Sequence, residues 1–201
     1  MKALKVLSFL LVCVVTHMSY GQDYTFDKKV TSKFLGHTRV FFFNSKDDSF
    51  FMEVSNREEL VVSRIFDLKI KQQYYLYENP VDSQKLTYLK TDSLLSKVRN
   101  YTFEFVESKS DNDAETSEVI FKIFNAENKR IAKYKLTVKK ADQSLFHLYK
   151  LSTLETLLGM EIKPPFNFIV LKAKGTNTHG NSTKYLLESI ENINKTIKVP
   201  R

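Results

Sequence analysis

The chain of 201 residues contains one cysteine and no tryptophan. The cysteine, Cys13, lies in an N-terminal segment that we expect to be removed, so the mature chain would contain no thiol. This absence excludes structural disulfides, thiolate metal sites and a cysteine nucleophile. The lack of tryptophan argues against a carbohydrate-binding module, because tryptophan offers large flat faces on which sugars can stack.

Sequence patterns of common catalytic and metal sites are also missing. No two histidines stand four residues apart as in metalloproteases, and no serine lies in a nucleophile-elbow pattern. Residues 111–115 begin like a calcium loop, but Thr116 stands where the turn needs glycine, and Lys122 where a glutamate should close the site. We therefore predict no metal and no other cofactor.

An enzyme, a hydrolase of unknown class, is the third hypothesis for the function and the least favoured. It would require two or more polar side chains from distant parts of the sequence to meet in one cleft. The candidates for such a site are His37, Asp47, Glu104, His147 and His179.

The N-terminal residues 1–21 have the pattern of an export signal: two lysines, then an apolar run over 6–15, then small or polar residues. An apolar run of about ten residues is too short to cross a hydrocarbon layer of roughly 30 Å as a helix. We predict a cleaved signal peptide and a secreted or periplasmic protein without a transmembrane segment. A lipid anchor on Cys13 is disfavoured, because Val12 stands where lipoprotein signals carry a small residue.

The formal net charge of +8 falls to about +6 when the two leader lysines are removed. The basic residues follow strand periodicity; in 130–139, for example, Tyr134 and Leu136 share one face while Lys133 and Lys135 share the other. Such a charge is compatible with an anionic envelope surface as a partner. Nucleic acid is not a predicted partner, since no helix-turn-helix, aromatic RNA-binding signature or zinc ligand set occurs.

Apolar and polar residues alternate along the whole mature chain, which is the period of half-buried strands. Turn-forming clusters separate the alternating segments. We predict a single antiparallel β domain over 22–201, a meander curved into an open barrel or a sandwich. The expected strands are 24–35, 38–43, 49–55, 60–66, 70–77, 85–89, 99–107, 118–125, 130–140, 145–150, 166–174, 184–190 and 194–199.

Two short helices are expected beside these strands. Residues 152–155 match a capping box, and Gly159 can supply the left-handed residue that ends a helix. Residues 92–98 offer an Asp or Ser cap followed by apolar residues on one side. Each helix would cover one end or one face of the sheet. The polar and acidic loop 108–117 is expected to be the most mobile segment.

Several strands are apolar on both faces, namely 41–43, 50–52, 74–77 and 168–171. The second face of each must therefore be covered. A second sheet, a short helix laid across the first sheet, an interior cavity or a partner protein could cover it.

The leading functional hypothesis is an exported, non-enzymatic envelope protein that binds a lipid or another apolar or amphipathic ligand in a groove or cavity of the curved sheet. The rival hypothesis is a surface adhesion or protein-interaction module, which would expose an aromatic patch. The predicted lining of the groove consists of aromatic and large apolar side chains from the expected strands: Phe42, Phe50, Met52, Tyr75, Tyr77, Phe103 and Phe168.

The opening of the mature chain, 24–30, its cysteine-free strand pattern and its closing segment, 189–200, carry a resemblance to known proteins. Together they resemble uncharacterised secreted β proteins of Gram-negative envelopes. The general pattern is more distantly similar to periplasmic lipoprotein carriers. That likeness implies a curved antiparallel sheet that holds acyl chains under short helices, and it assigns no ligand contact to a particular residue.

Overall fold

The computed structural model describes residues 21–57, 60–78, 86–94, 100–108, 115–154, 157–158 and 160–200. Except for Gly21, the predicted signal peptide lies outside the described residues. Most of the predicted loop 108–117 and residues 95–98 of a predicted helix also lie outside them.

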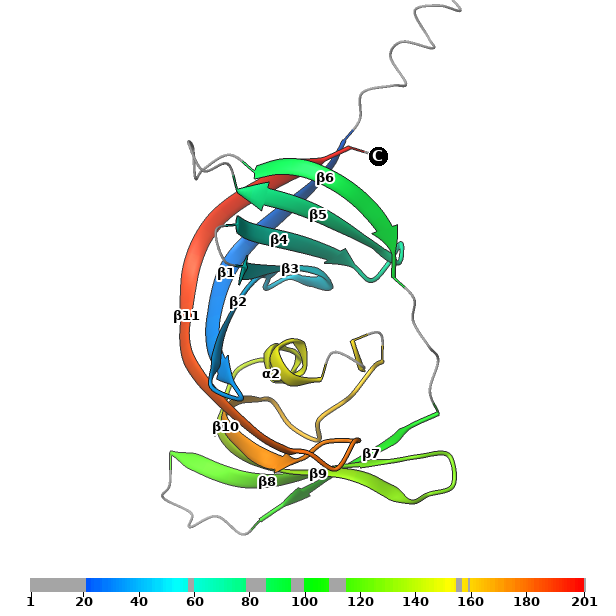
Figure 1. Cartoon of the computed structure of the whole chain (residues 1–201). Coiled ribbons are helices and arrows are strands. Elements are labelled where there is room, and N and C mark those ends of the chain that lie inside the picture. Colours follow the sequence, from blue (N-terminus) through cyan, green and yellow to red (C-terminus); the bar gives the residue numbers. More distant parts are fainter. Residues whose placement is uncertain are drawn as a thin grey trace, which may run out of the picture.

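One antiparallel sheet of eleven strands forms most of the described chain, which confirms the all-β prediction. Its order is β6-β5-β4-β3-β2-β1-β11-β10-β9-β8-β7, so two meanders are joined where β1 pairs with β11 (Figure 1). The edges β6 and β7 do not pair, and the sheet stays open. The elements are β1 (Gln22–Phe34), β2 (His37–Asn44), β3 (Asp47–Arg57), β4 (Leu60–Asp67), β5 (Gln72–Glu78), β6 (Leu86–Ser93), β7 (Thr102–Glu107), β8 (Thr116–Phe124), β9 (Arg130–Lys140), α2 (Phe146–Thr153), β10 (Phe168–Thr176) and β11 (Ser182–Val199).

The ends of β1 and β11 run past β2 as a two-stranded ribbon. We call residues 22–26 of β1 and 195–199 of β11 the end ribbon. The register shifts between Phe26 and Lys28, and such irregularities let a sheet bend sharply. The end ribbon folds over one face of β3–β5, and a buried apolar cluster fills the space between them: Tyr24, Phe26, Met52, Ile65, Tyr74, Leu76, Ile197 and Val199.

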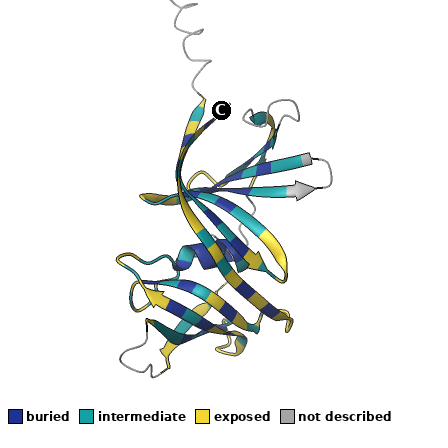
Figure 2. Cartoon of the chain, turned by 90° about the vertical axis from the view of Figure 1, so that its left-hand side faces the viewer, coloured by how far each residue is buried: buried dark blue, intermediate teal, exposed yellow. Residues whose placement is uncertain are grey.

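Helix α2 lies inside the curve of the sheet (Figures 1 and 2). Leu148 and Leu151 of α2 pack in one cluster with side chains of β1–β4, while Phe146 and Tyr149 join a second cluster with β8–β10. In β2 and β3, which are apolar on both faces, one face therefore packs under the end ribbon and the other packs against α2. A covering helix, one of the expected arrangements, occurs; the end ribbon belongs to the same sheet and not to a second one.

The strand expected at 145–150 is wrong, because these residues form most of α2. The alternation of Leu145, His147 and Tyr149 is too short to exclude a helical period, which also places the apolar residues of this segment on the buried side. The helix expected from Ser152 starts six residues earlier, at Phe146. Ser152 lies in its last turn, where its hydroxyl donates to the Leu148 carbonyl at 3.0 Å.

Two other boundaries differ from expectation. The strands expected at 184–190 and 194–199 are one strand, β11, of 18 residues. Asp92 and Ser93, expected to cap a helix, instead end β6. Among the described residues, no helix is long and apolar enough to span a membrane.

Candidate functional site

A cleft of about 410 Å³ opens between α2 and the turns that join β2 to β3 and β4 to β5. We call it the helix cleft. It exists because α2 lies across the inner face of the sheet without filling the space beside these turns. The apolar side chains of its wall come from β2, β3, α2 and the segments after β4 and α2: Phe43, Phe50, Phe51, Leu68, Leu151, Leu158 and Met160.

The polar side chains of the helix cleft come from α2, from the start of β3 and from the segments after β4 and α2: His147, Lys150, Asp48, Ser49, Lys69 and Glu161. His147 and Lys150 are three residues apart, so they lie on neighbouring turns of the same helix face. The Lys150 ammonium donates a hydrogen bond of 3.1 Å to the Met160 carbonyl, and Lys150 forms no ion pair with any described residue. Burial lowers the pKa of Lys150, and the Asp48 carboxylate at the start of β3 opposes this shift.

His147 is packed more tightly than Lys150. Its ring lies edge-on to Phe43 with 5.4 Å between the ring centroids, and its buried Nε2 has no hydrogen-bond partner in the described chain. Burial lowers the pKa of His147 to about 4; the Lys150 charge adds to this shift, while Asp48 and a backbone hydrogen bond to Ser144 oppose it. His147 is therefore a neutral imidazole at neutral pH.

The neutral His147 predicts a loss of stability in acid. Its pKa is about 4 in the folded state and about 6.5 in the unfolded state, so the unfolded chain binds the proton more tightly. The stabilisation is present above pH 6.5 and is lost as the pH falls towards 4. Between pH 7.5 and 4.5, we expect the free energy of unfolding of His147→Gln to fall by about 2–3 kcal/mol less than that of the unaltered chain. Urea unfolding followed by circular dichroism measures both values; equal losses would contradict the assignment.

A second polar cluster lies on the inner face, on β2–β4. Glu53 is 5% exposed and forms ion pairs with both Arg39 and Arg64. Arg39 also donates to the Ser152 carbonyl at 3.4 Å, near the end of α2. The Arg39–Glu53–Arg64 cluster thus ties the helix to the sheet. Because its charges are engaged with one another, we assign it a structural role.

The structure does not bring the seven predicted groove residues together. Met52, Phe42 and Phe50 pack in or against the cluster under the end ribbon, and Phe103 and Phe168 belong to the core between α2 and β7–β10. Tyr75 and Tyr77 share the face of β5 that pairs with Arg64 and Val62 of β4. Of the seven, only Phe50 lines the helix cleft.

The five candidate catalytic residues also occupy separate places. His147 lines the helix cleft, and none of the other four does. His37 begins β2, Asp47 begins β3, and Glu104 of β7 forms an ion pair of 3.1 Å with Lys122. His179 lies in the turn before β11. No group of three or more metal-binding side chains occurs in the part of the chain that the structure describes.

Sequence reasoning missed most of the helix cleft. Lys150 was placed on a strand expected at 145–150, and Leu151, Leu158 and Met160 were not predicted to line a cleft. The signal that could have found Lys150 is its spacing from His147, since these two polar residues stand three apart among the apolar and aromatic residues of 145–151. On a helix this spacing makes a polar stripe beside an apolar surface.

Large apolar side chains exposed elsewhere are scattered. Among the described residues, seven large apolar side chains are more than a third exposed, and Tyr88 is the one aromatic residue of these seven. They lie on β6, β7, β11 and two turns. The described surface therefore gives little support to an interaction module that uses an aromatic patch.

Comparison with known proteins finds no family that matches the sequence and no matching curated protein. One solved structure to which the chain is similar is a DUF1329 family protein from Desulfovibrio piger. The two share 11% identity over 90% of each chain, with a TM-score of 0.20. At these values the likeness carries no argument about fold or function.

Proposed function

We propose that this chain is an exported, non-enzymatic protein that binds an amphipathic anion in the helix cleft, with the apolar part along the cleft wall and the anionic head at Lys150. The observation that carries the proposal is an apolar wall beside a largely buried ammonium group that forms no ion pair with a described carboxylate; Asp48 and Glu161 also line the cleft. The cleft volume of about 410 Å³ is within the usual range of ligand pockets.

Charge and burial favour an anionic head over a neutral one. A buried cation loses its hydration and is stable only when other groups replace the lost water. The Met160 carbonyl satisfies one of the three protons of Lys150, and a carboxylate or phosphate would accept another in a charge-assisted hydrogen bond. The His147 ring, neutral at neutral pH, adds polar surface without adding repulsion.

The proposal predicts discrimination between an acid and its ester. We expect Lys150→Met to weaken binding of dansyl-labelled undecanoic acid about tenfold or more, since hydrogen bonds to charged groups contribute about 1.5–3 kcal/mol. Binding of the methyl ester of the same probe should change less than about twofold. Fluorescence titration of the full chain measures both. Lys46→Met, in the exposed turn between β2 and β3, is the matched control.

A second variant tests whether the cleft is the site. Ser49 lines the helix cleft, so Ser49→Trp should block acid and ester alike, whereas Ser182→Trp at the exposed start of β11 should leave both unchanged. Solvent extraction of the gently purified protein, followed by mass spectrometry, would identify a natural ligand. An absent natural ligand together with equal probe binding by Ser49→Trp and the unaltered chain would overturn the proposal.

A further inference from the structure

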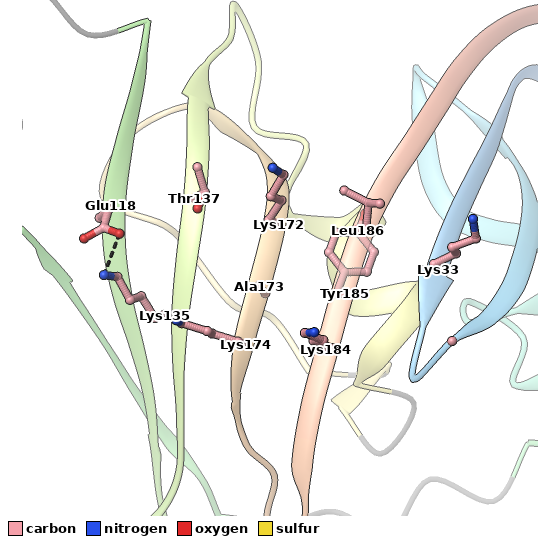
Figure 3. Close-up of a pocket in the computed structure, with 11 residues that line it drawn as sticks. Lys33, Glu118, Lys135, Thr137, Lys172, Ala173, Lys174, Lys184, Tyr185 and Leu186 are labelled. Atoms are coloured by element: carbon pink, nitrogen blue, oxygen red, sulfur yellow. Dashed lines mark ion pairs between the residues drawn. The ribbon is translucent and has the colours of Figure 1, made fainter.

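A second concave surface lies on the outer face of the sheet, away from α2. It is a groove of about 530 Å³ over β1 and β8–β11, lined by five lysines and one glutamate (Figure 3). Lys135, Lys174 and Lys184 stand directly opposite one another on three adjacent strands. Their neighbours Tyr134, Ala173 and Tyr185 point inward into the core. We call this surface the lysine groove.

The placement of these lysines is electrostatically unfavourable in the isolated protein. Like charges directly opposite across paired strands destabilise a sheet. Glu118 neutralises Lys135, and Glu188 neutralises Lys33, each at 2.6 Å. Lys172, Lys174 and Lys184 form no ion pair with any of the described residues.

Other lysines on the same face are paired differently. At the β7–β8 and β8–β9 pairs, Lys122 is matched by Glu104, and Lys139 by Glu115. Glutamates of β7 and β8 and of the residue before β8 thus pair with lysines on β8 and β9. The lysines of this face that form no ion pair with a described residue lie on β9, β10 and β11: Lys133, Lys172, Lys174 and Lys184. A solvent-facing surface without a partner has no need of this asymmetry.

Exposed leucines accompany the unpaired lysines. Leu186 lines the lysine groove and is 37% exposed. Leu35, 52% exposed, lies in the adjoining turn, where its amide donates to the Lys184 carbonyl at 3.0 Å. A soluble anion would use only the lysines. A bilayer surface uses both, since its phosphates attract the ammonium groups while apolar side chains enter the boundary of the acyl region.

We propose that the lysine groove is a docking surface for an anionic phospholipid bilayer, with Lys172, Lys174 and Lys184 against the lipid phosphates and Leu35 and Leu186 inserted between headgroups. This proposal does not depend on the helix cleft, which is built from other side chains. Lys150→Met is therefore expected to leave bilayer binding unchanged, so the two proposals can fail separately.

Vesicle flotation of the full chain tests the docking surface. We expect binding to phosphatidylcholine vesicles containing phosphatidylglycerol, none to pure phosphatidylcholine, and weaker binding at high salt. Replacing Lys172, Lys174 and Lys184 by Gln should reduce the partition coefficient about 100-fold, at roughly fivefold for each lysine. The control replaces Lys46, Lys129 and Lys140, which are exposed and outside the groove, and has the same net charge. An equal loss in the control would overturn the proposal.

A second arm separates a bilayer from a soluble phosphate. Leu35→Asn with Leu186→Ser should reduce vesicle binding about tenfold and leave calorimetric binding of glycerophosphate unchanged. Asparagine suits position 35, where φ is 52°. If glycerophosphate binds the groove and vesicles do not, the site is one for a small soluble anion and the bilayer proposal is wrong. Vesicle binding that the leucine variant does not weaken would overturn the insertion of these side chains.

Discussion

Replacement of Glu53 by alanine is expected to lower the free energy of unfolding by about 3–5 kcal/mol, the usual loss when one member of a buried ion pair is removed. Glu53 is 5% exposed and binds two arginines whose side chains are only 20% and 27% exposed. Without the carboxylate, two partly buried guanidinium groups of like charge would remain on β2 and β4, on either side of β3.

The surroundings of the cluster make this loss hard to avoid. The Arg39 guanidinium lies 5.6 Å from the Phe41 ring centre, and that of Arg64 lies 5.2 Å from the Phe66 ring centre. These aromatic contacts hold the arginine stems on the inner face, so the two guanidinium groups cannot turn easily into water. Arg39 also contacts the end of α2, so part of the loss should appear as weaker docking of the helix.

Two comparisons isolate the buried charge. Glu104→Ala removes an ion pair with Lys122 in which the glutamate side chain is 45% exposed. We expect this change to lower the free energy of unfolding by less than about 1 kcal/mol. Glu53→Gln keeps the shape of the side chain without its charge and should fall between the two. Urea unfolding at pH 7.5, followed by circular dichroism, gives all three values. A Glu53→Ala loss no larger than that of Glu104→Ala would contradict a buried, stabilising cluster.

The same strand shows what periodicity can and cannot predict. Alternation along β3 puts Phe51 and Glu53 on one face of the sheet and Phe50 and Met52 on the opposite face. It thereby predicts a strand that is covered on both sides. It does not predict what covers each side, because the end ribbon joins residues more than 160 positions apart in the sequence. The groove residues were chosen for their apolar character, which is equally the property of a packed core.

Helix α2 is the clearest case of tertiary structure overriding a local pattern. No side chain caps its first turn. Ser152, which the sequence pattern placed at the start of a helix, lies near the end of α2. The helix is held by burial of Phe146, Leu148, Tyr149 and Leu151 between two parts of the sheet. Helical stability in proteins comes mostly from such packing, so the helix cleft could not be placed before the sheet was known.

Replacement of Phe121 by alanine is expected to cost about 3–5 kcal/mol, the range for large aromatic side chains removed from a core. Phe121 is fully buried, stacks on Phe105 at 4.7 Å between ring centres, and meets Phe146 of α2 edge-on at 5.3 Å. Its removal would leave a cavity between β7–β9 and the first residue of the helix. In a domain of about this size the melting temperature should fall by roughly 10 °C, at about 2–4 °C for each kcal/mol.

The position of Phe121 gives the measurement a second readout. Because Phe146 begins α2, weaker packing there should loosen the helix and raise amide hydrogen exchange along 146–153 more than along β3–β5, which pack under the end ribbon. Phe121→Leu, which keeps most of the buried surface, should show a smaller fall and little change in exchange. Val106→Ala on the exposed side of β7 serves as the neutral control. If exchange rises equally in both halves of the sheet, α2 docks as part of one cooperative unit, and the separate loosening predicted for the helix is wrong.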